Sequence, residues 1–273
     1  MKLDYATQVS PYPILLSMGT LRKPKLRDIF DPRSQFKMSF QKFNFYEFLI
    51  SMSPEDFFAQ LGEKEGKDFW ASLPADVRGK ITVFDLIIQN EELQKHFLEV
   101  FNFFFEETVL FAESTFVLVK PDKDYAQEPP TREDVTGFID SHNFSEILSI
   151  MQQICCISGE TEEETPKFKN KTAEKLYYQM KNAEKKQRQN RKIDRNMTLP
   201  NIISKVSRRH NSLNFTNIWD LTIFQLLDNF GGLCEDVIFD IECTGVSVWG
   251  DEKKKFDPSK WYKNNFDNRK SDF

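Results

Sequence analysis

The sequence predicts a mainly α-helical protein with minor β structure, in which two helical units are joined by a charged connector. Three observations predict this class. Apolar side chains recur at helical intervals in several stretches, the 273 residues include 10 glycines but 27 phenylalanines, and the composition changes abruptly near residue 160. We therefore expect a core of aromatic rings on a backbone with few flexible points.

The composition is typical of a soluble protein that stays inside a cell. Charged residues make up 29% of the chain, the formal net charge is -5, and the sequence contains no run of apolar residues long enough to cross a membrane. Residues 1–10 lack the apolar core of a secretory signal. The four cysteines form neither a disulfide framework nor a pair of metal knuckles, which favours a reducing compartment.

The predicted N-terminal domain covers residues 1–158. Its first 32 residues are interrupted too often for a long helix, at Pro11, Pro13, Gly19, Pro24 and Pro32. We expect an extended chain that turns at Met18-Gly19 and lies across the domain surface.

Two helices are expected next. The first covers residues 36–50 and is expected to point Phe45, Phe48, Leu49 and Met52 inward. The second follows the sequence SPED at residues 53–56, which places a cap, a first-turn proline and two acidic side chains at a helix N-terminus.

Residues 82–107 show the clearest helical periodicity of the domain. Their inward positions are Leu86, Leu93, Phe97, Phe101 and Phe104. Residues 109–111 and 115–119 are β-branched and aromatic, and they are expected to pair as a short hairpin.

Two capping-box patterns predict helices at the end of this domain. One pairs Thr131 with Asp134 and the other pairs Asn143 with Glu146. The second is followed by an apolar stripe from Phe144 to Cys155.

The predicted connector covers residues 159–199. An acidic run is followed by residues 167–195, which hold 11 Lys or Arg and 3 Asp or Glu. A narrow apolar stripe that includes Leu176, Tyr177 and Met180 indicates an exposed amphipathic helix.

The predicted C-terminal unit covers residues 200–273. After an apolar segment around Ile202, a helix is expected over residues 216–230 with Trp219, Ile223 and Leu226 inward, stopped by the two glycines at 231–232. Residues 237–241 and 246–249 are interpreted as a two-stranded piece, with a further helix left open as the alternative.

The tail of this unit is too polar to build a core of its own. Aromatic side chains are nevertheless spaced along it, at Trp249, Phe256, Trp261, Tyr262 and Phe266. Such residues either dock back onto the domain or anchor a partner at an interface.

No pattern of reactive side chains predicts catalysis. Phosphate-loop, dinucleotide-loop and nucleophile-elbow motifs are absent, and His96, His142 and His210 stand in separate predicted elements without a second ligand at helical spacing. Cys155 and Cys156 are interpreted as buried apolar side chains. We expect no enzyme activity, no cofactor and no metal site.

Two parts of the chain resemble a known family. These are residues 10–30 (SPYPILLSMGTLRKPKLRDIF) and residues 217–228 (NIWDLTIFQLLD), the latter with 248–252 (VWGDE) and 255–263 (KFDPSKWYK). They resemble proteins encoded in the tail gene clusters of phages infecting Gram-positive bacteria, which are similar to tail assembly chaperones. The resemblance implies a helical, virus-encoded assembly factor and carries over no site residues.

The functional hypothesis is therefore a non-enzymatic tail assembly chaperone that binds tail proteins such as the tape measure protein in the host cytoplasm. The candidate partner-binding residues are Leu176, Tyr177, Met180, Trp249, Phe256, Trp261, Tyr262 and Phe266. One alternative is a structural component of the virion tail or neck. Another is a nucleic-acid-binding accessory protein that uses the basic connector. This alternative is the weaker one, because the chain as a whole is acidic. No membrane partner is expected, and the oligomeric state is left open.

Overall fold

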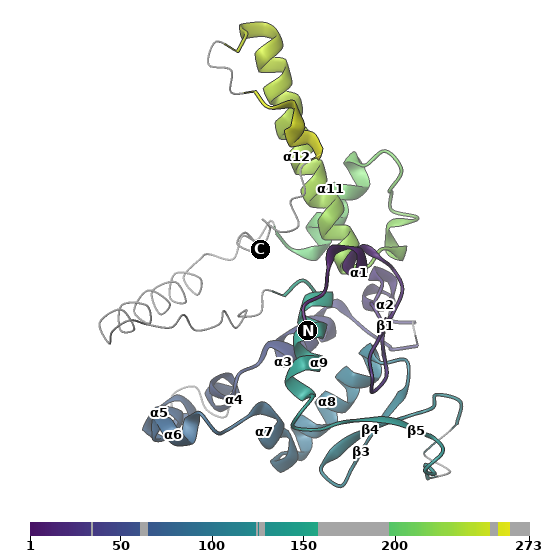
Figure 1. Ribbon diagram of the computed structural model, residues 1–273, viewed down its shortest axis with the longest axis vertical. Coiled ribbons are helices and arrows are strands. Elements are labelled where there is room, and N and C mark those ends of the chain that lie inside the picture. Colours follow the sequence, from purple (N-terminus) through teal and green to yellow (C-terminus); the bar gives the residue numbers. More distant parts are fainter. Residues whose placement is uncertain are drawn as a thin grey trace.

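The computed structural model describes residues 1–33, 35–60, 65–123, 125, 129–157, 197–251 and 256–262 (Figure 1). In these residues the chain is mainly helical, with a two-stranded and a three-stranded antiparallel sheet. The predicted class, mainly α with minor β, is confirmed. The predicted connector, residues 159–199, lies outside the described residues except for its last three.

The N-terminal segment, residues 1–30, contains α1 (Tyr5–Val9), a hairpin of β1 (Ile14–Leu15) and β2 (Thr20–Leu21), and α2 (Leu26–Phe30). The predicted turn is confirmed, since the Leu16 N–H donates to the Gly19 carbonyl at 2.9 Å. The prediction of a segment lying on the surface is wrong for its apolar side chains, which are buried at Leu21, Leu26 and Ile29. The prolines prevent a long helix, but the short stretches between them are apolar enough to enter the core.

Seven helices follow the N-terminal segment within the described part of the N-terminal region. They are α3 (Phe40–Ser51), α4 (Pro54–Gln60), α5 (Glu65–Ser72), α6 (Ala75–Arg78), α7 (Val83–Gln89), α8 (Glu91–Phe104) and α9 (Phe144–Ile154). The predicted helix over residues 82–107 is thus two helices. Asn90 divides them, because its side chain accepts a hydrogen bond from the Leu93 N–H at 2.9 Å and caps α8.

The predicted inward face of helix α3 is confirmed in part, since Leu49 and Met52 are buried and Phe48 packs against the core, but Phe45 does not point inward. Phe45 is 37% exposed, whereas Phe43, Tyr46 and Ile50 are buried. Apolar side chains stand on almost every face of this helix, so periodicity alone does not select the buried one. The core selects it, because the Phe103 ring of α8 lies edge-on to Phe43 and Tyr46.

The three-stranded sheet has the order β3 (Thr108–Ala112), β4 (Thr115–Val119), β5 (Val135–Ile139). The first two strands are the predicted hairpin, which is confirmed with Val109 opposite Leu118 and Phe111 opposite Phe116. Phe116 stacks edge-on against Phe101 of α8, so the sheet covers the aromatic core.

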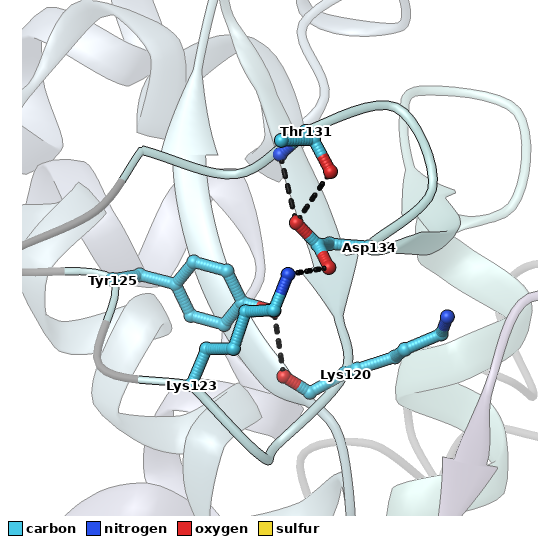
Figure 2. Close-up of polar contacts among 5 residues, drawn as sticks. All are labelled: Lys120, Lys123, Tyr125, Thr131 and Asp134. Carbon is cyan, nitrogen blue, oxygen red and sulfur yellow. Dashed lines mark hydrogen bonds and ion pairs between the residues drawn. The ribbon is translucent and has the colours of Figure 1, made fainter.

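The third strand replaces the helix predicted from Thr131 and Asp134. Asp134, which is 3% exposed, accepts hydrogen bonds from the Thr131 N–H at 2.9 Å and the Thr131 hydroxyl at 2.6 Å, and it pairs with Lys123 Nζ at 2.5 Å (Figure 2). These bonds resemble a helix cap, yet they close a turn. The chain then pairs with the edge of β4, from Val135 onward, in place of forming a helix.

The C-terminal region contains α11 (Leu199–Arg209), a 3-10 turn η1 (Ile218–Asp220), α12 (Ile223–Trp249) and a second 3-10 turn η2 (Pro258–Tyr262). A small apolar cluster holds it together, made of Leu26, Ile202, Ile203, Val206, Ile218 and Leu226. Leu26 belongs to α2, and its N–H donates to the Leu221 carbonyl at 2.9 Å. The N-terminal segment therefore supplies part of the C-terminal core.

Candidate functional site

Helix α12 has two parts with different surroundings. Its first turn is anchored by Thr222, whose side chain accepts a hydrogen bond from the Gln225 N–H, and by buried Ile223 and Leu226. From Gly231 to Trp249 no residue is buried. In Figure 1 this distal part, residues 231–249, extends away from the rest of the molecule with η2 beside it.

The predicted end of the helix at the two glycines, and the strand pair after them, are wrong. A glycine ends a helix by taking a positive φ, and within the described residues the glycine that does so is Gly250, with φ 76°. Gly231 and Gly232 stay helical, at a cost of about 1 kcal/mol each relative to alanine. The β-branched residues that predicted strands lie on the helix, which was the alternative left open.

The distal part presents an apolar face to solvent. Ile238 is 59% exposed, Ile241 66%, Val248 63% and Trp249 84%. Together with exposed Cys234 and with Gly245, these residues recur at intervals of three and four, so they lie along one side of the helix. We call the set Cys234, Ile238, Ile241, Gly245, Val248 and Trp249 the distal surface.

Acidic side chains border the distal surface. Helix α12 carries Asp228, Glu235, Asp236, Asp240 and Glu242 and has no Lys or Arg. Consecutive residues are turned by about 100° around a helix, so Asp240 and Glu242 lie on opposite sides of Ile241. The result is an apolar stripe with negative charge along both edges.

The predicted tail aromatics differ in their surroundings. Phe256 docks back, since its ring stacks on Phe239 of α12 with centroids 5.8 Å apart. Trp249 and Trp261 are exposed, at 84% and 68%. Tyr262 ends η2, and nothing further is described of its side chain.

Four of the candidate partner-binding residues, Leu176, Tyr177, Met180 and Phe266, lie outside the described residues. The sequence reasoning missed Ile238, Ile241 and Val248, because these residues were interpreted as strand. Their signal was present: Cys234, Ile241 and Val248 are spaced by seven, which is typical of a helix face that meets another helix.

The described residues contain no group of three or more His, Cys, Asp or Glu side chains placed to hold a metal ion. Cys155 is buried at the end of α9, and burial raises the pKa of the neighbouring Cys156 thiol to about 12. A thiol with so high a pKa is a weak nucleophile at neutral pH. This pair therefore packs as apolar side chains.

The helices of the described residues also differ from membrane-spanning helices. None of them combines the length and the apolar character that a membrane-spanning helix needs. This includes α12, whose 27 residues carry five carboxylates.

Comparison with known proteins gives one family. Residues 184–265 match the family model of the YomV second domain, a stretch that contains all of α11, η1 and α12. No curated protein and no solved structure matches the chain. The match covers less than a third of the sequence, and it indicates a phage-associated protein family.

Proposed function

We propose that this protein is a phage tail assembly chaperone, which acts without catalysis by binding another protein through the distal surface of α12. The observation that carries the proposal is the exposure of Ile238, Ile241, Val248 and Trp249 on one side of a helix that leaves the body of the molecule. Exposed apolar patches that are bordered by polar residues mark interaction sites. Large aromatic side chains such as Trp249 are frequent anchors at such sites.

The resemblance of both ends of the chain to tail-gene-cluster proteins supports the choice of partner, and so does the family match over residues 184–265. The expected partner is a tail protein, with the tape measure protein first, met in the host cytoplasm before the tail is complete. A helix of that partner would lie along the distal surface and be kept from aggregating.

Co-purification with the tape measure protein tests this function. The two proteins are co-expressed, the chaperone is captured, and the partner is quantified. An Ile238→Ser/Ile241→Ser variant is expected to retain less than a tenth of the partner, because two central apolar contacts are lost. A Leu15→Ser variant is the matched control, since Leu15 is 80% exposed on the N-terminal hairpin. Equal retention by both variants would contradict the proposal.

The structural alternative makes a different prediction for finished particles. A chaperone leaves before the virion is complete, whereas a tail or neck component stays. Mass spectrometry of purified particles separates the two, and a stoichiometric copy number of this chain would replace the chaperone proposal by the structural one.

A further inference from the structure

The chemistry of the partner segment can be taken further, on the condition that the proposed function holds. We infer that the distal surface of α12 receives an amphipathic helix of another protein whose apolar stripe is flanked by Lys and Arg. The argument rests on the shape of the distal surface, on the charge along its edges and on the open space above one glycine.

The shape of the surface fits a helix. Cys234, Ile238, Ile241, Gly245 and Val248 follow one another at intervals of three and four, so they form a straight stripe along α12. At a rise of about 1.5 Å per residue, the stripe is about 21 Å long. A second helix lying alongside would meet it for about four turns, and an extended strand would find no sheet edge there.

The charge along the edges selects the kind of helix. Asp240 and Glu242 flank Ile241 on its two sides, and α12 has no cation from Ile223 to Trp249. Asp240 is exposed and Glu242 is half-buried. A helix with Lys or Arg beside its own apolar stripe would place cations against these carboxylates, and a helix with Asp or Glu there would be repelled.

The same charges argue against a second copy of α12 as the occupant. Two copies of this helix, in either direction, would bring acidic edges together with no Lys or Arg of their own to separate them. The whole chain is also acidic, with a formal net charge of -5. The electrostatic match therefore points to a different, cationic chain.

Gly245 adds a shape constraint in the middle of the surface. A Cβ atom built at this position would meet nothing within 4 Å, so packing within the chain does not require a glycine there. Its neighbours along the stripe, Ile241 and Val248, are large, and the glycine therefore leaves a notch between them. A large apolar side chain of the partner would fill this notch.

Binding of two designed peptides to the full-length protein tests the inference. One is a 20-residue amphipathic helix with a leucine stripe flanked by lysines, and the other has every lysine replaced by glutamate. Fluorescence anisotropy of labelled peptides measures both affinities at low and moderate salt. We expect the lysine peptide to bind at least tenfold more tightly than the glutamate peptide, and to weaken as salt rises.

Charge reversal locates the effect on α12. An Asp240→Lys/Glu242→Lys variant, which changes one carboxylate on each edge of the stripe, is expected to lose or reverse the preference for the lysine peptide. The matched control, Asp122→Lys/Glu133→Lys, makes the same change of net charge at two exposed positions far from α12 in the sequence and is expected to keep it. An equal loss in both variants would mean that the lysine peptide merely follows net charge, and it would overturn the inference.

A Gly245→Ala variant distinguishes an effect on peptide binding from an effect on the stability of the helix. Alanine favours the helix, so the helix content of the variant is expected to be equal or higher. Its affinity for the lysine peptide is nevertheless expected to fall at least threefold, because the notch is filled. An unchanged affinity would overturn the role given to Gly245.

Three further results would overturn the inference as a whole. One is a dimer in sedimentation that Ile241→Ser abolishes, which would make a second copy the occupant. Another is tighter peptide binding after replacement of the Lys and Arg of residues 167–195 by Gln, which would make the chain's own basic segment the occupant. The last is capture of the tape measure protein together with a preference for the glutamate peptide. This result would contradict a cationic partner helix but would still support the proposed function. Failure to bind either peptide or the tape measure protein would instead contradict the proposed function.

Discussion

At the scale of single residues, Glu47 makes stability depend on pH. It lies on α3, and burial raises its carboxyl pKa from 4.5 to about 7. The folded state therefore favours the protonated form of Glu47. The stability that this protonated carboxyl contributes is fully present below pH 4.5 and is lost as the pH rises through 7. The loss is at most about 3 kcal/mol, at 1.36 kcal/mol per unit of pKa.

Glu47→Gln is expected to remove this dependence, because glutamine resembles the protonated acid and does not titrate. Urea unfolding at pH 5 and pH 8 measures it: the wild-type protein should be less stable at pH 8, and the difference should shrink in the variant. A variant with the full wild-type difference would show that other groups are responsible.

Gly137 in β5 illustrates a glycine required by close packing. A Cβ atom at this position would lie 2.1 Å from the Met18 carbonyl oxygen, which belongs to the hairpin turn of the N-terminal segment. Gly137→Ala is expected to destabilise the protein by about 1–3 kcal/mol, as overpacking does in tight cores. A melting temperature equal to that of the wild-type protein would contradict this contact.

At the scale of elements, Gly232 of α12 is the contrasting case. Nothing lies within 4 Å of a Cβ atom built there. Gly232→Ala is expected to stabilise the distal part of the helix locally by about 0.5–1 kcal/mol, with slower amide exchange in residues 233–249 as the measurement. Faster exchange there would mean that the backbone at residue 232 is not helical in solution.

The elements that could be predicted from the sequence are those with one unambiguous pattern. Leu93, Phe97 and Phe101 on α8 stand at core spacing between polar residues, and the predicted face is the buried one. On helix α3 the inward positions Leu49 and Met52 were predicted correctly, but Phe45 was not, because the helix is apolar nearly all round. The helix predicted from Thr131 and Asp134 was wrong because the same side-chain hydrogen bonds can cap a helix or close a turn. The unpaired edge of β4 decides between the two, since the chain after Asp134 pairs with it as β5.

The candidate site was predicted only in part, for a related reason. Trp249 and Trp261 could be noted as aromatic residues in a polar tail, and they are exposed. Ile238 and Ile241 could not be assigned, because β-branched residues fit a strand or a helix and the choice depended on whether two glycines end α12. That choice is made by backbone hydrogen bonding over the whole helix, which local propensity does not contain.

At the scale of the whole molecule, the N-terminal segment connects regions that are far apart in the sequence. Leu26 is fully buried among C-terminal residues, Arg27 pairs with Asp220, and Gln225 Nε2 donates to the Val9 carbonyl at 2.8 Å. The C-terminal helices therefore depend on the first 30 residues for part of their core.

Leu26→Ala is expected to cost about 2–5 kcal/mol, as for other fully buried leucines. Arg27→Ala, at the next position, is expected to cost less than about 1 kcal/mol because its ion pair is half exposed. Thermal unfolding followed by the loss of α12 helicity compares them. Similar melting temperatures for the two variants would mean that α2 does not support the C-terminal core.

The unequal anchoring of α12 has a consequence for how the protein comes apart. A helix that is buried only in its first turns frays from its C-terminal end, so a protease should cleave there first and leave the remainder intact. A bound partner would shield those turns. Resistance to proteolysis would then report the fraction of molecules with a bound partner. Molecules without a partner would be the first to be degraded.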